Sequence, residues 1–196
     1  MSRNILFISV DTIKDRTGLH LNVDPKLVYP DILFAQDAYI LPVLGTALYN
    51  KLQDDIDCKN LTCDYETLLN DYITPCLVYQ VMAELPMALS YQFYNKGVVK
   101  KTGEGQTEPS ASELTEVAQR YTSRAEYYRQ RLVKYLKQQS SQNKFPEYLN
   151  PGSGVDTIVP DNQAYTISVW LGDDDCCAGK TFEEMYQGNI NRCCGK

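Results

Sequence analysis

The feature that most constrains this chain is an apolar helical pattern over residues 65–94, whose second half is hydrophobic on nearly every side. A helix of that kind cannot lie on a protein surface and belongs at the centre of a bundle. Pro75 and Pro86 predict bends in it. Its longest apolar run is interrupted by Gln80, Glu84 and Pro86, whereas a membrane-spanning helix needs roughly 18–20 uninterrupted apolar residues. We therefore expect a core helix in a soluble, cytoplasmic protein without a membrane partner.

The pattern that begins at Asp24 predicts two further helices. Asp24 is a good N-cap, and Pro25 occupies the first helical position, where no amide hydrogen is needed. Apolar residues then recur at helical spacing, but Pro30 and Pro42 each remove a hydrogen bond from within the pattern. We expect a kinked path in which two helices meet near Leu41–Pro42.

The chain before this pattern is short and apolar. Residues 4–10 are rich in β-branched and aliphatic side chains, which predicts a strand or an extended lead-in. Ser9 can then cap a short helix, which Gly18 ends.

A long amphipathic helix is predicted over residues 112–139. Ser110 and Glu113 have the spacing of a capping box at its start. Its inner face recurs in alternating steps of three and four, typical of a seam for another helix, and comprises Leu114, Val117, Tyr121, Ala125, Tyr128, Leu132 and Tyr135. Its outer face is basic and comprises Arg120, Arg124, Arg129, Arg131, Lys134 and Lys137. That face is either solvated or a partner site.

Residues 95–111 separate the two main helical patterns. They are rich in Gly, Lys and Thr and have little to bury, which predicts a flexible loop. The first half of the loop carries Lys96, Lys100 and Lys101, although the whole chain has a formal net charge of −6. That net charge argues against nucleic-acid binding by the whole surface, but it leaves room for a local basic site.

Residues 150–196 differ in character from the helical part, so we predict two domains, 1–149 and 150–196. Residues 165–171 alternate strictly, with Tyr165, Ile167, Val169 and Leu171 on one side, as in a strand. Residues 156–163 are a candidate hairpin partner that Pro160 confines to a sheet edge. Because a two-stranded ribbon is marginal alone, we expect an extended arm that pairs with a neighbouring chain, hinged at 150–154.

Catalytic chemistry is scarce in the sequence, and no residue is predicted to be catalytic. His20 is the single histidine, and no nucleophile or orienting carboxylate accompanies it in a recognisable pattern. The acidic runs at 54–57 and 173–175 lack the spacing of a calcium loop. We expect neither an enzyme nor a bound cofactor.

The cysteines leave one alternative open. Cys176, Cys177, Cys193 and Cys194 place four thiols within a short span. Structural zinc sites mostly use pairs separated by two residues, so adjacent pairs fit poorly and we predict no metal. The other readings are a zinc-stabilised interaction module and a regulatory nucleic-acid-binding protein that uses the basic helix 120–137, although no helix-turn-helix is evident.

The stretch "ISVDTIKDRTGLHLNVDPKLVYPDILFAQDAYILPVLGTALYNKL" resembles the small helical adaptor proteins at the head-to-tail connector of tailed bacteriophages. The shared pattern is a short helix, a turn, an Asp-started helix with "AQD.YI", and "LG..LY..L". Together with "MAELPMALSYQFYNKGVVKKTGE" and "RYTSRAEYYRQRLVKYL", it looks more specifically like the connector ring proteins of crAss-like phages. The resemblance covers about residues 5–149.

The resemblance implies a structural virion protein that is assembled in the host cytoplasm. Its expected fold is a mainly α, kinked helical bundle of the connector-adaptor type, followed by a C-terminal β-ribbon or extended arm. Such adaptors form dodecameric rings beneath the portal, bind further tail or connector proteins and line a channel through which genomic DNA passes.

Two sets of contact residues follow from this expectation. Lys96, Lys100 and Lys101 would contact DNA in the channel or the portal, unless the loop is only a solvated surface loop. The candidates for subunit interfaces are Arg124, Arg131 and Lys134 on the long helix and the four alternating side chains Tyr165, Ile167, Val169 and Leu171 of the arm.

Overall fold

The computed structural model describes residues 5–95, 97–100, 109–140, 144–154 and 156–161. The chain divides into two compact units, Met1–Ala164 and Tyr165–Lys196, and every described residue belongs to the first. The first unit therefore continues past the predicted boundary between residues 149 and 150. Residues 156–161 form no strand, and the rest of the predicted ribbon lies outside the described residues.

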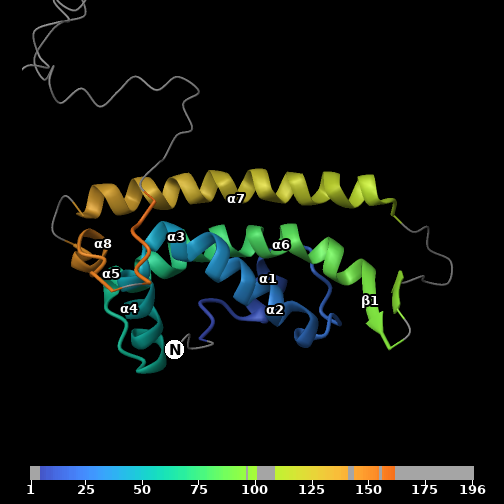
Figure 1. Ribbon diagram of the computed structural model, residues 1–196, viewed down its shortest axis with the longest axis horizontal. Coiled ribbons are helices and arrows are strands. Elements are labelled where there is room, and N and C mark those ends of the chain that lie inside the picture. Colours follow the sequence, from blue (N-terminus) through green and yellow to red (C-terminus); the bar gives the residue numbers. More distant parts are fainter. Residues whose placement is uncertain (1–4, 96, 101–108, 141–143, 155, 162–196) are drawn as a thin grey trace, which may run out of the picture. The chain divides into compact units, whose positions relative to one another are not determined.

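The described chain is mainly helical, as predicted (Figure 1). Its elements are, in order, α1 (Val10–Arg16), α2 (Pro25–Ala35), the π-helical turn η1 (Gln36–Ile40), α3 (Leu41–Leu44), α4 (Thr46–Asp57), α5 (Cys63–Thr67), the π-helical turn η2 (Leu68–Ile73), α6 (Thr74–Ser90), β1 (Tyr91–Tyr94), β2 (Gly97–Lys100), α7 (Ala111–Ser140) and α8 (Pro146–Leu149).

Helix α6 lies at the centre of this bundle, as its apolar pattern predicts. It packs against α7 on one side and against α2 and α1 on the other (Figure 1). Leu77, Val81 and Leu85 are at most 1% exposed. Burial on both sides explains why almost no side of this helix can be polar.

Two of the prolines are accommodated by π-helical turns, whereas Pro30 and Pro86 lie inside α2 and α6. Pro42 and Pro75 each follow a π turn, and the residue before each proline donates its amide to a carbonyl five residues back, Leu41 to Gln36 and Thr74 to Leu69. The wider turn makes room in the helical path where the proline removes an amide donor. Two helical elements, η1 and α3, do meet at Leu41, as predicted, but the helical path is not interrupted there and continues to Leu44.

The break comes instead at Gly45, whose φ is +75° and ψ is 160°. Residues 156–161, which we call the strap, lie across this break. The Thr46 amide donates to the Ile158 carbonyl at 3.1 Å, and the Asp161 amide donates to the Pro42 carbonyl at 2.7 Å. The strap thus satisfies a carbonyl at the end of α3 and an amide at the start of α4, which helix ends otherwise leave unpaired.

The lead-in 5–8 is not a strand, because a side chain takes the place of a partner strand. Gln36 is fully buried. Its Oε1 accepts from the Phe7 amide, and its Nε2 donates to the Ile5 carbonyl, both at 2.9 Å. Its Nε2 also donates to the Tyr49 hydroxyl at 2.9 Å, and that hydroxyl donates to Asp37 at 2.6 Å. We call this arrangement the Gln36 clamp.

The expected helix caps are present. The Ser9 hydroxyl accepts from the Thr12 amide at 3.1 Å, and Asp24 accepts from the Lys26 amide at 3.0 Å. At the start of α7, the Glu113 amide donates to the Ser110 hydroxyl at 3.3 Å while the Ser110 amide donates to Glu113 at 2.6 Å. The predicted capping box is confirmed.

The end of α6 differs from the prediction. The helix ends at Ser90 rather than near Tyr94, and β1 and β2 form an antiparallel hairpin in which Tyr91 pairs with Lys100 and Tyr94 with Gly97. The sequence 91–99 is rich in aromatic and β-branched residues, which favour a pleated strand over a helix. Part of the predicted loop 95–111 is therefore ordered as a strand.

Among the residues that the structure describes, one helical stretch, Pro25–Leu44, is long and apolar enough to cross a membrane by length and composition alone. Core helices of water-soluble proteins pass the same test. Val28, Ile32 and Ile40 of this stretch are completely buried within the unit.

Candidate functional site

Five tyrosines form two stacked groups along the seam that η2 and α6 make with α7, and we call the two groups together the tyrosine ladder. Tyr72 and Tyr135 are stacked with ring centroids 3.8 Å apart, and Tyr79 stacks on Tyr128 at 5.4 Å and on Tyr121 at 6.4 Å. All five are partly exposed. Stacked rings on two packed helices give a rigid, flat surface with polar edges.

The ladder lies on a flank because of helical geometry. Tyr121, Tyr128 and Tyr135 recur every seven residues, whereas a straight α-helix drifts by about 20° per heptad. The fully packed line follows an eleven-residue spacing instead, through Leu114, Ala125 and Leu136, which are 7%, 2% and 0% exposed. The expected inner face is thus only partly buried.

Val117 shows the same effect at the other end of the predicted seam. It was expected to face inward, but it is 44% exposed. The next residue, Ala118, is half-buried. The alternation of threes and fours located the seam to within one residue of its true position.

Two arginines lie on the ladder. The guanidinium carbon of Arg124 is 5.8 Å from the ring centroids of both Tyr79 and Tyr121. That of Arg131 is 4.8 Å from the centroid of Tyr72. Both arginines are exposed. Cation–π contacts of this kind hold a planar guanidinium in place while its N–H donors stay available.

A shallow pocket of about 340 Å³ opens beside Arg124 and is lined by Tyr79, Ser123, Arg124, Tyr127 and Tyr128. Tyr127 is 65% exposed, and its ring meets that of Tyr128 edge to face with centroids 5.3 Å apart. The Ser123 hydroxyl donates to the Gln119 carbonyl at 2.9 Å, so the phenols and the guanidinium are the donors that line this patch of surface. Such a patch suits a carboxylate or another anion.

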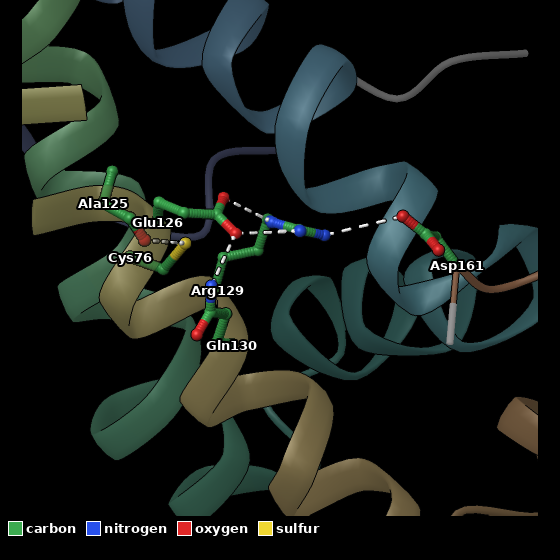
Figure 2. A network of polar contacts seen from close by, with 6 residues as sticks. All are labelled: Cys76, Ala125, Glu126, Arg129, Gln130 and Asp161. Atoms are coloured by element: carbon green, nitrogen blue, oxygen red, sulfur yellow. Dashed lines mark hydrogen bonds and ion pairs between the residues drawn. The ribbon is translucent and has the colours of Figure 1, made fainter. Parts of the chain in front are cut away.

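Arg129 does not belong to the outer basic face, contrary to the sequence-based expectation. Its side chain is 25% exposed and makes a bidentate pair with Glu126, at 2.7 and 2.9 Å. Figure 2 shows the guanidinium between Glu126 and Asp161 of the strap, whose carboxylate is 3.5 Å away. The hydrogen bonds from Arg129 lower the pKa of Glu126. This arginine therefore ties α7 to the strap.

Cys76 lies in the same region and has a packing role. Its Sγ is 3.7 Å from the Ala125 carbonyl (Figure 2). Burial raises the pKa of its thiol to about 12. The predicted assignment of Cys76 to the core is confirmed by its 2% exposure.

The remaining candidates fall in different places. Lys134 is exposed on α7, and Lys100 is the last residue of β2. Lys96 and Lys101 lie outside the described residues, as do all four arm candidates, Tyr165, Ile167, Val169 and Leu171, and the four paired cysteines of the tail.

His20 has a local structural role, because its Nδ1 accepts the Asn22 amide at 3.1 Å within a turn. Among the described residues, no three side chains of His, Cys, Asp or Glu converge as metal ligands do. Cys58 and Cys63 are exposed free thiols.

The sequence-based predictions did not include the tyrosine ladder. The signal was present, because Tyr65, Tyr72 and Tyr79 repeat with the same seven-residue interval as the tyrosines of the long helix. Two matching heptad sets on antiparallel neighbours can meet along one flank. Only Tyr65 stands apart, since it donates to Glu147 at 2.8 Å and packs edge to face on Phe145.

These features define a helical bundle whose described surface bears an aromatic and basic stripe beside its central helix. The chain belongs to a family of unknown function, DUF6712, whose model matches residues 40–158. The matched span begins at the end of η1 and reaches the strap residue that bonds to Thr46. No curated protein and no solved structure matches the chain.

Proposed function

We propose that this protein is a structural adaptor that forms a ring at the head-to-tail connector of a tailed bacteriophage and joins portal to tail. The observation that carries the proposal is the location of the residues on which the resemblance rests. Gln36, Asp37 and Tyr49, from "AQD.YI" and "LG..LY..L", form the Gln36 clamp, in which Gln36 and Tyr49 are buried. Gly45 of the second motif provides the helix break.

These motif residues therefore have a structural role within the fold. They hold the lead-in, η1 and α4 together, and such a role explains why the spacing of the motif resembles that of a family of scaffolding adaptors. In this proposal the protein performs no catalysis and needs no cofactor. It acts by presenting surfaces in a fixed arrangement.

The β1–β2 hairpin is the element that we assign to the portal or the DNA channel. It follows α6 directly and ends at Lys100. Lys96 and Lys101, the other two lysines of this proposal, are neighbours of the hairpin in the sequence. Lysines in a bore would contact phosphates without reading base sequence. The arm, with Tyr165, Ile167, Val169 and Leu171, is proposed to cross to a neighbouring subunit or another connector protein.

The test is a mass measurement and imaging of the full chain with and without the portal protein from the same genome. We expect closed rings, either alone or on the portal, with the twelve-fold symmetry that the resemblance implies. A phage that lacks the protein should accumulate filled or leaking heads without tails. Normal tailed particles in its absence, or failure to bind the portal in any assembled state, would rule out the proposal.

A further inference from the structure

The outer side of α7 carries a second helical seam, whose residues are all exposed. They recur in alternating steps of three and four, the spacing of a helix face that packs against another helix. We call this set the outer seam, and it comprises Val117, Arg120, Arg124, Tyr127 and Arg131. Val117 and Tyr127 are 44% and 65% exposed, so the seam combines large side chains with positive charge.

The arginines of the outer seam have donors that the described fold does not use. Arg124 and Arg131 contact tyrosine rings, and neither makes a hydrogen bond or an ion pair within the described part of the chain. The ring contacts hold both guanidinium groups in place for a bidentate contact with a carboxylate. The ladder rings are covered by one another and by the arginines, so little ring surface is left on which nucleic-acid bases could stack.

A surface of opposite charge lies across α2 and α6. We call it the acidic face, and it comprises Leu27, Asp31 and Phe34 on α2 and Glu84 and Met87 on α6. Within each helix these residues are three or four positions apart and therefore share one side. Leu27, Phe34 and Met87 are 38%, 53% and 51% exposed. Exposed apolar side chains that are grouped beside polar ones mark protein interaction sites.

Tyr39 shows that the two halves of the acidic face are adjacent. Its ring meets that of Phe34 edge to face with centroids 6.0 Å apart, and its hydroxyl donates to Glu84 at 3.0 Å. Asp31 is also close enough to Glu84 for the two negative charges to interact unfavourably. The two carboxyl groups and the three apolar side chains therefore belong to one patch.

The charge of Asp31 is not compensated within the described chain. Its Oδ2 is buried without a hydrogen-bond partner there, and neither Asp31 nor Glu84 forms an ion pair with a described basic residue. A poorly solvated carboxylate lowers stability unless a cation accompanies it. Because Asp31 as a whole is only half-buried, an arginine of another polypeptide can approach it from the surface.

We propose that the outer seam of one copy docks on the acidic face of the next copy, head to tail. This inference rests on the proposed ring function and names the contact between subunits. Arg124 and Arg131 supply the cations that Asp31 and Glu84 lack, and the exposed apolar side chains of the two surfaces pack together. The pocket beside Arg124 can receive a side chain of the acidic face.

The arrangement of the helices suits a ring. Helices α7 and α2 pack on opposite sides of α6 (Figure 1), so the outer seam and the acidic face are different surfaces of one chain. A contact between two different surfaces is heterologous, and it generates a ring when its rotation closes. Two outer seams repel one another, as do two acidic faces, so the head-to-tail pairing is favoured over the symmetric ones.

The test uses two full-length variants that are changed only at exposed positions. The seam variant carries Arg124→Glu and Arg131→Glu, and the face variant carries Phe34→Lys and Met87→Lys. Native mass measurement, alone and with the portal, should show that each variant assembles at least about tenfold more weakly than the wild type, because like charges meet. A one-to-one mixture should assemble again, because the two variants can alternate around a ring with an even number of subunits.

The matched control carries Leu21→Lys and Tyr29→Lys. These two positions are 72% and 45% exposed, and Tyr29 is two residues from Asp31, which places it on the other side of α2. The control adds the same two positive charges as the face variant and should assemble as the wild type does. Circular dichroism of every variant should retain the wild-type helicity.

Asp31→Asn separates the contact from the stability of the subunit. The neutral amide should stabilise the dilute, unassembled chain, because no charge is then buried beside Glu84. It should nevertheless weaken assembly several-fold, because a partner arginine loses its carboxylate. A purely structural role of Asp31 would move both quantities in the same direction, and assembly as tight as that of the wild type would overturn the proposed charge pairing.

The other outcomes identify which idea fails. If the wild type assembles and the mixture of variants does not, the proposed contact is wrong while the ring function stands. If the seam variant assembles normally but no longer retains DNA, the outer seam is a nucleic-acid surface and the inference is overturned. If the wild type forms no ring even with its portal, the function itself fails and the contact with it.

Discussion

At the scale of single residues, Gly45 decides where the helical path breaks. Its backbone lies in a region that L-residues with side chains rarely adopt, and a Cβ there would be 2.7 Å from Cδ and Cγ of Pro160. Glycine thus permits the turn between α3 and α4 and the close approach of the strap. Pro42, which looks like a stronger break, is absorbed by a π turn, and Pro30 lies inside α2 without ending it.

Gly45→Ala should lower the free energy of unfolding by about 1–3 kcal/mol, because backbone strain adds to a clash with the strap. Chemical denaturation measures this. Gly18→Ala is the matched control, since a Cβ at Gly18 meets nothing within 4 Å and should change stability by less than about 0.5 kcal/mol. Equal effects of the two substitutions would show that the strap does not rest on Gly45.

Asp31 is a second residue considered by itself, because its environment lowers the stability of the fold. Its Oδ2 is buried without a hydrogen-bond partner among the described residues. Burial raises the pKa of this carboxyl, and the nearby Glu84 raises it further. An acid whose folded pKa is above its unfolded pKa destabilises the fold once the pH rises through the folded value, and this penalty is absent below the unfolded value.

Asp31→Asn should therefore raise the melting temperature at pH 7, because the amide carries no charge near Glu84. The advantage should shrink as the pH falls towards 4 and vanish once Asp31 is protonated in both states of the wild type. A gain that is independent of pH would assign the effect to packing instead. Thermal melts across that pH range give the answer.

At the scale of elements, one side chain of the Gln36 clamp makes the hydrogen bonds to the lead-in backbone that a partner strand would otherwise make. The amide group is both donor and acceptor, so it can pair with the Phe7 amide and the Ile5 carbonyl at once. It also reaches Tyr49 on α4. The lead-in, η1 and α4 therefore share one buried polar centre.

Gln36→Leu should cost roughly 2–4 kcal/mol of stability, because it leaves buried backbone groups without partners. The Phe7 amide should also lose protection in hydrogen exchange. Tyr49→Phe is the graded control. It keeps both backbone pairings of Gln36 and should cost only about 1 kcal/mol, with Phe7 still protected. Retained protection in Gln36→Leu would mean that the lead-in is held by packing alone.

At the scale of the whole molecule, the strap extends the first compact unit beyond the last helix. It bonds to Pro42 and Thr46, accepts an ion pair from Arg129 and covers Gly45. The family match, which reaches residue 158, includes the first half of this segment. The strap is thus part of the fold, and any arm begins after it.

A chain ending after Ala164 should match the full chain in the free energy of unfolding of the helical unit. A chain ending after Tyr148 should stay helical but lose about 2–4 kcal/mol, because three strap hydrogen bonds and its packing are missing. Paired denaturation curves compare the two. Equal stability would show that the strap contributes nothing, and an unfolded short chain would place the strap in the folding core.

Much of this architecture is readable in the sequence because it depends on local chemistry. Caps at Ser9, Asp24 and Ser110 need only a side-chain oxygen near free amides. The central position of α6 follows from the apolar side chains on nearly all of its own sides, and the long helix α7 follows from its periodicity. Two further features could have been predicted from the sequence, namely the seven-residue repeat of tyrosines and the strand-forming composition after Ser90.

The rest was decided by tertiary structure. Whether Pro42 or Pro75 breaks its helix depends on the π turn before it, and buried side chains such as Gln36 and Ile40 in η1 and Leu68 and Ile73 in η2 anchor these turns in the core. The partner of the lead-in is a glutamine more than twenty residues away, as a hydrogen bond to Phe7 shows. Arg129 and Arg131 lie on the same helix but differ in role, because two residues two positions apart point about 200° away from each other. Arg129 therefore faces the strap, and Arg131 lies on the tyrosine ladder. These outcomes depend on which remote segments lie close together in space, and a local sequence pattern does not contain that information.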